Sequence, residues 1–377
     1  MSGMPRFASR AAMPVGVAAI AAAAVGLGPT LVAAAKPSPP PVTAKQLLVR
    51  AQNTHIQTLS GTIGTHTDLG LPELPDNANT DMRGPLKALT SDHTVRVALD
   101  GPKRQRVQVL DKLAERDLIH NGRDVWAYDS KANKVTHWRL PAGSGGSHAD
   151  RDQAPSAPTP QRLAQRFLDK AGKTTKVSVD GTATVAGRDA YVLDLAPKAQ
   201  ESTIGSVKVY VDADNSVPLR VSVTPRTGGP PAVDVGFSDV SFSTPPASRF
   251  DFTPPKGATV KQGRLPAGDM PTRMFHHSAH RSTANGNGSH GSERATPGAA
   301  HQMAGMSHKV IGHGWTAVLE SKVGPGVASM PIVRSGQRVD GGRLVTTRLV
   351  NALVTDDGHV YVGAVTPRAL LDAAGHS

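Results

Sequence analysis

The sequence contains no cysteine among its 377 residues. A disulfide, a thiolate metal site and a cysteine nucleophile are therefore excluded, and so is lipidation at a bacterial lipoprotein cysteine. Aromatic residues are scarce, at 4% of the chain, whereas 38 glycines and 30 prolines are present. This abundance of glycine and proline predicts long loops or linkers between the compact elements.

Enzyme signatures are also absent from the sequence. It has no G-x-S-x-G, no P-loop, no H-E-x-x-H and no dinucleotide-binding glycine motif after a strand. The segment D-A-D-N-S at 212–216 lacks the central glycine and the final glutamate of a calcium loop, so we interpret it as a hairpin turn. We expect a protein that is not an enzyme and needs no cofactor.

The N-terminal 35 residues resemble an export signal. Arg6 and Arg10 precede an uncharged, alanine-rich stretch over 11–35, which ends in small residues and a Pro-rich spacer at 36–42. We expect cleavage near residue 35, with an uncleaved N-terminal anchor as the alternative. Both place the bulk of the protein outside the cytoplasm. The net charge of +12 then favours an anionic membrane surface as a partner and makes nucleic acid an improbable one.

Hydrophobic periodicity predicts an α+β domain over residues 43–260. Helices are expected at 43–57 and 159–172, each with a threonine at its N-cap. Between and after them, short turns such as Asn121-Gly122 separate runs of alternating apolar residues, which is typical of an antiparallel meander. The apolar positions expected to share faces of these strands include Val97, Leu99, Val109, Tyr191, Leu193, Val209, Val221 and Phe237.

The segment H-N-G-R-D-V-W-A-Y-D-S-K-A-N-K-V-T-H at 120–137 predicts a hairpin with two aromatic residues on one face. Trp126 and Tyr128 share that face, and Val125 and Ala127 share the other. Because both faces are apolar, we expect the strand to be covered on both sides. Trp126 and Tyr128 then either belong to a solid core or line a cavity of lipid size.

Residues 261–309 have little periodicity and predict a disordered linker. Imidazole and thioether groups together suit copper, and imidazole alone suits zinc or nickel, so metal binding is a further hypothesis for this segment. Residues 310–377 follow as an ordered C-terminal segment with a hairpin around Asp357-Gly358 and a short final helix. The candidate metal ligands are His276, His277, His280, His301, Met303, Met306 and His308.

The order helix, meander, loop, helix, meander resembles the half-barrel folds of the LolA and RseB type. The chain is similar to that superfamily in I-H-N-G-R-D-V-W-A-Y-D at 119–129, V-K-V-Y-V-D-A-D-N-S-V-P-L-R at 207–220 and F-D-F-T-P-P-K-G at 250–257. With T-R-L-V-N-A-L-V-T-D-D-G near the C-terminus, it resembles exported actinobacterial LolA-like proteins of the DUF2092 type.

This resemblance implies a curved antiparallel sheet, an incomplete β-barrel, which encloses helices and an apolar cavity. It implies a secreted or cell-envelope carrier of lipid or of lipoprotein acyl chains. Its cavity would be lined by Trp126, Tyr128 and the eight apolar strand residues named above. The alternative is an RseB-like sensor or regulator that docks a membrane protein partner.

Overall fold

The computed structural model describes residues 39–54, 56–71, 92–111, 113–140, 159–169, 172–263, 308–323 and 326–375. All described residues belong to one compact unit. The predicted signal segment and almost all of the predicted linker therefore lie outside the described residues. No helix in the described ranges is both long enough and apolar enough to cross a membrane.

Two short helices begin where threonines cap them, as the sequence predicted. Thr43 accepts a hydrogen bond from the Gln46 amide and closes a capping box at the start of α1 (Ala44–Gln52). Thr159 caps α3 (Pro160–Leu168) in the same way, with proline at the first turn. Both helices are shorter than predicted. At the end of α1, the Asn53 side chain donates to the Val49 carbonyl and offers an alternative to another helical turn.

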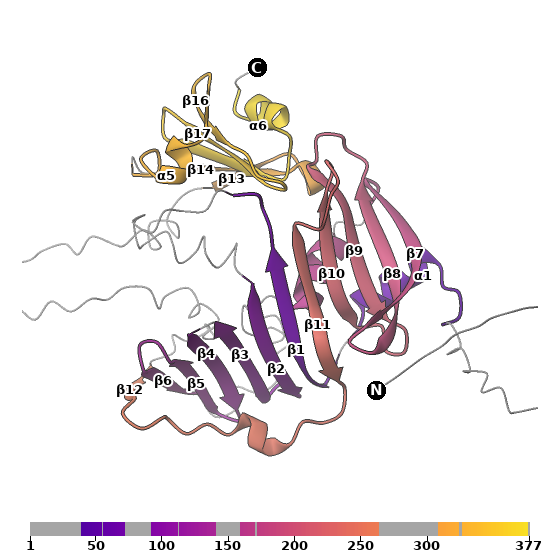
Figure 1. Cartoon of the computed structure of the whole chain (residues 1–377), viewed down its shortest axis with the longest axis vertical. Helices are drawn as coiled ribbons and strands as arrows, with labels where there is room; N and C mark the ends of the chain where they lie inside the picture. The colour runs from indigo at the N-terminus through magenta and orange to yellow at the C-terminus, as the bar shows by residue number, and fades with distance from the viewer. Residues whose placement is uncertain are drawn as a thin grey trace, which may run out of the picture. The chain divides into compact units, whose positions relative to one another are not determined.

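Most of the strands form one sheet of 12 strands, in the order β12-β6-β5-β4-β3-β2-β1-β11-β10-β9-β8-β7 (Figure 1). Neighbouring strands are antiparallel except for β12, which pairs with β6 in parallel. Since β12 and β7 lie at opposite edges, the curved sheet is not closed into a barrel. The strands are β1 (Thr58–Thr67), β2 (His93–Asp100), β3 (Arg104–Asp111), β4 (Ala114–Asn121), β5 (Asp124–Asp129), β6 (Lys134–Arg139), β7 (Thr175–Val185), β8 (Arg188–Pro197), β9 (Ile204–Asp212), β10 (Pro218–Pro225), β11 (Val233–Ser241) and β12 (Thr259–Gln262).

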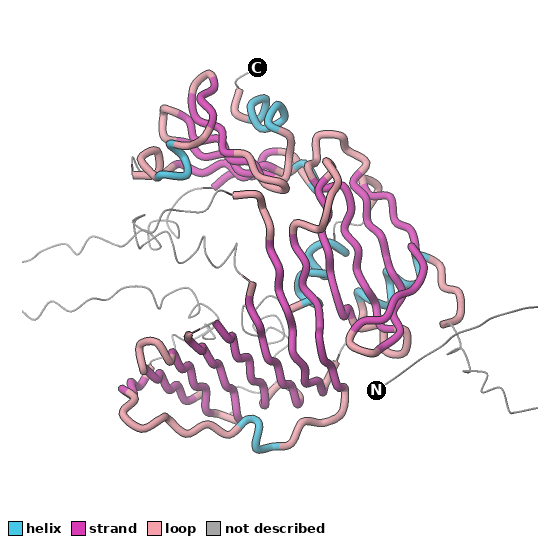
Figure 2. Tube along the Cα trace, viewed as in Figure 1, coloured by secondary structure: helices cyan, strands magenta, loops and turns pink. Residues whose placement is uncertain are grey.

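The sheet has two faces that differ in what covers them. We call the face on which α1 and α3 pack the helix-side face (Figure 2). The opposite face is covered at β3 and β4 by the chain that follows β11, so we call it the strap-side face and residues 243–258 the strap. The strap contains the short helix η2 (Ala247–Phe250) and leads into β12. Between β11 and β12 the strap contains no strand and lies against the sheet at β3 and β4.

The C-terminal residues form a second sheet, which is larger than the predicted hairpin. Its six strands run in the order β13-β14-β18-β17-β16-β15, and the predicted hairpin is β17–β18. Leu353 and Leu370 are at the centre of its small core. The elements are β13 (His308–Ile311), η4 (Gly314–Thr316), β14 (Val318–Lys322), α5 (Pro331–Arg334), β15 (Gln337–Val339), β16 (Gly342–Val345), β17 (Asn351–Thr355), β18 (His359–Gly363) and α6 (Pro367–Ala373).

Candidate ligand-binding face

Four of the predicted lining residues lie on β8, β9 and β10 beneath the two helices. Register pairs Leu193 with Val209 and Val209 with Val221, and directly paired residues share a face. Tyr191 lies two residues from Leu193 on the same face. All four are at most 4% exposed and pack in one cluster with the buried residues of α1 and α3.

Four more of the predicted lining residues lie farther along the same face, on β2, β3 and β11: Val97, Leu99, Val109 and Phe237. Ile63, at the centre of this second cluster, pairs with Phe237 on one side and with Val95 on the other. Val97 alternates with Val95 on β2, and Val109 pairs with Val95 from β3. The residues at the cluster's margin, Leu99 and Val109, are half-buried, whereas Val97 and Phe237 are 5% exposed.

The two clusters form one continuous apolar face, because Leu163 and Val233 pack against both of them. The principal contacts of α1 fall on β7 and β8, and those of α3 fall on β10 and β11. Among the described residues, the helices therefore pack on the β7–β11 half of the helix-side face, while the apolar cluster continues beyond them across β1, β2 and β3.

A group of charged side chains borders this apolar surface on β2, β3 and β4. The Nδ1 atom of His93 is 2.8 Å from Oδ1 of Asp111, and Nη2 of Arg116 donates to the same carboxylate over 3.4 Å. These side chains are 15%, 32% and 31% exposed. An apolar surface with a partly exposed polar margin can hold an amphipathic ligand.

The hairpin aromatics lie on the opposite face from the other eight predicted residues. Trp126 pairs with Ile119 and His137, on the strap-side face. Its ring stacks on His137 with a centroid distance of 3.8 Å. The Phe252 ring of the strap lies 5.5 Å from Trp126 and 6.1 Å from Tyr128. The sheet thus separates the ten candidates into eight on the helix-side face and two under the strap.

A buried ion pair fastens the strap to the sheet. The Nε atom of Arg106 donates to both carboxylate oxygens of Asp117, at 3.2 and 3.0 Å, and its Nη1 donates to the Arg249 carbonyl of the strap at 3.1 Å. Asp117 is 1% exposed. Burial raises the pKa of Asp117 above its ordinary value and outweighs the opposing effect of Arg106. Arg106 thus connects a buried carboxylate to a segment distant in sequence.

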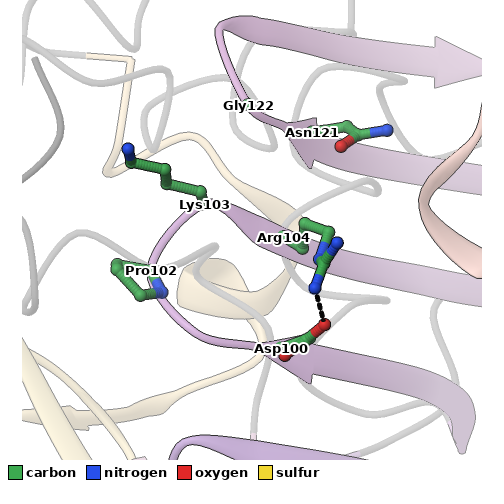
Figure 3. Close-up of a pocket in the computed structure, with 6 residues that line it drawn as sticks. All are labelled: Asp100, Pro102, Lys103, Arg104, Asn121 and Gly122. Carbon is green, nitrogen blue, oxygen red and sulfur yellow. Dashed lines mark hydrogen bonds and ion pairs between the residues drawn. The ribbon is translucent and has the colours of Figure 1, made fainter. Parts of the chain in front are cut away.

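A hollow of about 490 Å³ lies at the turns that join β2 to β3 and β4 to β5. Figure 3 shows its lining, in which the Arg104 guanidinium pairs with the Asp100 carboxylate. Lys103 adds a second positive charge, and Asn121 and Gly122 complete the far side. Its lining includes three charged residues and none of the predicted lining residues, so we do not assign it to an acyl chain.

The metal-ligand hypothesis is not tested by the structure. Of the seven candidate ligands, all but His308 lie outside the described residues, and His308 begins β13. Within the described ranges, no three histidine or acidic side chains are close enough together to hold a metal ion. The 212–216 segment is a hairpin turn, as predicted: the Asp212 carboxylate accepts the amides of Asp214 and Asn215 and pairs with Arg188.

Two residues that pack in the first cluster come from residues 310–377, which the sequence predicted to be an ordered segment beyond the linker. Trp315 is 4% exposed and Leu349 is 5% exposed. Nε1 of Trp315 donates to Oγ1 of Thr175 over 2.7 Å, and its ring stacks on Phe167. An isolated tryptophan in a loop-rich stretch was the available signal, since a tryptophan in a folded protein is usually well buried.

Residues 78–261 match the family model described as "Predicted periplasmic protein (DUF2092)". The predicted DUF2092 resemblance is therefore confirmed over this part of the chain, and the description of the family agrees with an extracytoplasmic location. A search of curated proteins finds no match to this chain.

Several solved structures resemble the chain in fold. The MucA/MucB complex of Pseudomonas aeruginosa contains a chain with 16% identity and a TM-score of 0.40, covering 88% of this chain and 96% of that one. A LolA superfamily protein from Nitrosomonas europaea has 15% identity and a TM-score of 0.22, over 56% and 99% of the two chains. An uncharacterised Thermus thermophilus protein has 13% identity and a TM-score of 0.32, over 58% and 99%. At these values the matches do not show shared ligands or partners.

Proposed function

Taking residues 78–261 as a DUF2092 region, we propose that the protein is an extracytoplasmic, non-catalytic binding protein for acyl chains of a lipid or lipoprotein. The ligand would lie on the helix-side face, against Leu99, Val109 and their neighbours. One observation carries the proposal. The apolar cluster of this face extends across β1, β2 and β3, beyond the strands that α1 and α3 contact, and Leu99 and Val109 at its margin are only half-buried.

The chemistry of this face suits an acyl chain. Each methylene removed from water contributes about 0.8 kcal/mol, so an apolar surface needs no specific hydrogen bonds to hold one. The charged group formed by His93, Asp111 and Arg116 lies at the margin, where a headgroup would remain in contact with water. Trp126 and Tyr128 are not part of this proposed site, because they lie on the strap-side face.

The first experiment is native mass spectrometry of residues 36–377, purified without detergent, followed by organic extraction and identification of any lipid. One lipid or lipopeptide per protein supports the proposal and identifies the ligand class. A protein that is free of lipid and takes none up from membranes contradicts it.

A matched pair of variants localises the ligand. Leu99→Gln places an amide on the helix-side face, and Leu110→Gln places the same amide on the strap-side face; both leucines are half-buried. We expect Leu99→Gln to lower lipid occupancy about tenfold or more, since an unpaired buried amide costs about 1–3 kcal/mol. Leu110→Gln should retain the lipid. Equal occupancy in the two variants would place the ligand elsewhere.

A second candidate function is docking of a membrane protein partner on the second sheet. The observation that favours it is a row of apolar residues that runs across β13, β14, β18, β17 and β16 on one face of this sheet. The row is exposed at Val310 (59%) and Leu319 (43%). The row continues through Val362, Ala352 and Val345, which are all half-buried. Crosslinking from position 319 in cells, with position 260 as a similarly exposed control (46%), tests this role. Capture of one membrane protein at position 319 alone would support it.

A further inference from the structure

We infer that the outer surface of α1 and α3 is the surface with which this protein contacts an anionic lipid bilayer. This goes beyond the proposed acyl-chain site, because the residues involved lie on the side of the helices away from the sheet.

Helical periodicity separates an inner and an outer side of α1. Leu47 and Ala51, four residues apart, are buried against the sheet. At 100° per residue, Lys45 and Val49 lie on the opposite side, and both are exposed. Val49 is 47% exposed and is the one large apolar residue of a described helix with such exposure.

The outer side of α3 carries two arginines. Ala164 and Leu168 are buried, so Arg162 and Arg166, again four residues apart, lie on the side away from the sheet. The two helices are neighbours, since Nε2 of Gln52 donates to the Leu168 carbonyl over 3.1 Å. Because both helices pack on one face of one sheet, their outer sides face the same way.

Within the two helices, all charged side chains are positive. Neither helix contains an acidic residue, whereas α1 contains Lys45 and Arg50 and α3 contains Arg162 and Arg166. Lys45, Arg50 and Arg166 form no ion pair with any residue that the structure describes. The acidic neighbour, Asp169 at the end of α3, accepts a hydrogen bond from Gln165. Four positive charges and one exposed valine on these two helices suit anionic headgroups and the adjoining apolar layer.

The course of the chain points to a bilayer as the occupant. The hydroxyl of Tyr191 donates to the Pro40 carbonyl over 2.6 Å, and Val42 packs in the same core as α1. Residues 39–43 therefore lie on the helix side of the sheet. The apolar segment 11–35 ends five residues before Pro40, a separation of at most about 18 Å. If that segment stays in the membrane, the outer side of the helices is within reach of the headgroups.

Vesicle co-sedimentation of residues 36–377 tests the inference. The vesicles contain phosphatidylcholine either alone or with phosphatidylglycerol. We expect salt-sensitive binding that requires phosphatidylglycerol. Since each basic residue near an anionic surface contributes about fivefold in affinity, Lys45→Glu/Arg166→Glu should weaken binding about 25-fold or more. Equal binding to both kinds of vesicle would overturn the inference.

Two matched controls separate this surface from the general basicity of the chain. Lys131→Glu/Lys134→Glu makes the same change in net charge at two exposed positions of the β5–β6 hairpin and should bind nearly as the unmodified protein does. Val49→Asn should weaken binding severalfold, whereas Val260→Asn, at an equally exposed position (46%), should not. Equal losses in both members of either pair would refute the assignment. Circular dichroism of each variant confirms that it is folded.

Discussion

Replacement of Trp315 by alanine tests whether the C-terminal residues share a core with the 12-stranded sheet. The indole is 4% exposed, and its ring is 5.8 Å from the Phe167 ring of α3, with 11° between the planes. Its Nε1 atom donates to Oγ1 of Thr175, at the start of β7, over 2.7 Å. The side chain of one C-terminal residue therefore contacts two elements of the larger sheet assembly.

The expected loss of stability follows from the apolar area that the Trp315 side chain buries and from the cavity that its removal leaves. A buried tryptophan covers about 150–250 Å², which at 25 cal/mol per Å² corresponds to about 4–6 kcal/mol as an upper value. Measured truncations of buried aromatic residues to alanine cost about 3–5 kcal/mol. We expect Trp315→Ala to lower the free energy of unfolding of the whole unit by about 4 kcal/mol.

The assay is urea denaturation of residues 36–377, followed by far-ultraviolet circular dichroism. Trp315→Phe keeps the ring stacking and removes the hydrogen bond, so we expect it to cost about 1–2 kcal/mol. Val310→Ala, at a position 59% exposed, serves as the control and should cost less than about 0.5 kcal/mol. A loss below about 1 kcal/mol in Trp315→Ala, or a separate early transition that leaves the main transition unchanged, would show that the two sheets fold independently.

Other predictions concern the strap and β1. Asp117→Asn should remove a pH dependence of the free energy of unfolding. Folding raises the pKa of Asp117, so the native state binds this proton more tightly than the unfolded state does. The wild type should therefore lose stability relative to the variant as pH rises from 3.8. Denaturant unfolding between pH 3 and pH 7 measures this, and a difference that grows in the opposite direction would contradict it. Gly61→Ala should cost about 1–3 kcal/mol, because its Cβ would lie 2.4 Å from the Asp239 carbonyl oxygen, whereas Gly64→Ala on the same strand meets nothing within 4 Å and should be close to neutral. Equal thermal midpoints for the two glycine variants would refute this explanation.

Local elements of this protein were predictable because short-range physics specifies them. Thr43 and Thr159 begin the two helices, since their hydroxyls satisfy amides within one turn. Gly122 adopts a positive φ of 66° in the predicted Asn121-Gly122 turn. The alternation of valine and leucine identified the strands, and the eight strand candidates on β2, β3 and β8–β11 do share one face.

For the hairpin aromatics, the sequence predicted that they share a face but not which face of the sheet it is. Alternation correctly placed Trp126 and Tyr128 on one face of β5, with Val125 and Ala127 on the other. Both faces are apolar, so the pattern carried no information about which of them meets the helices. That depended on the strap, whose Phe252 lies more than 120 residues farther along the chain and covers the Trp126 side.

The sequence by itself therefore determined the two capped helices, most strands of the 12-stranded sheet with their turns, and the resemblance to DUF2092. Only the tertiary structure decided which residues share a surface. It placed Trp315 and Leu349 in the core of the larger sheet assembly, and it placed the charges of α1 and α3 on one side. The physical reason is that capping, turn formation and strand alternation act within a few residues. The covering of a sheet face is instead a contact between distant segments, selected by the total apolar area that the whole chain buries.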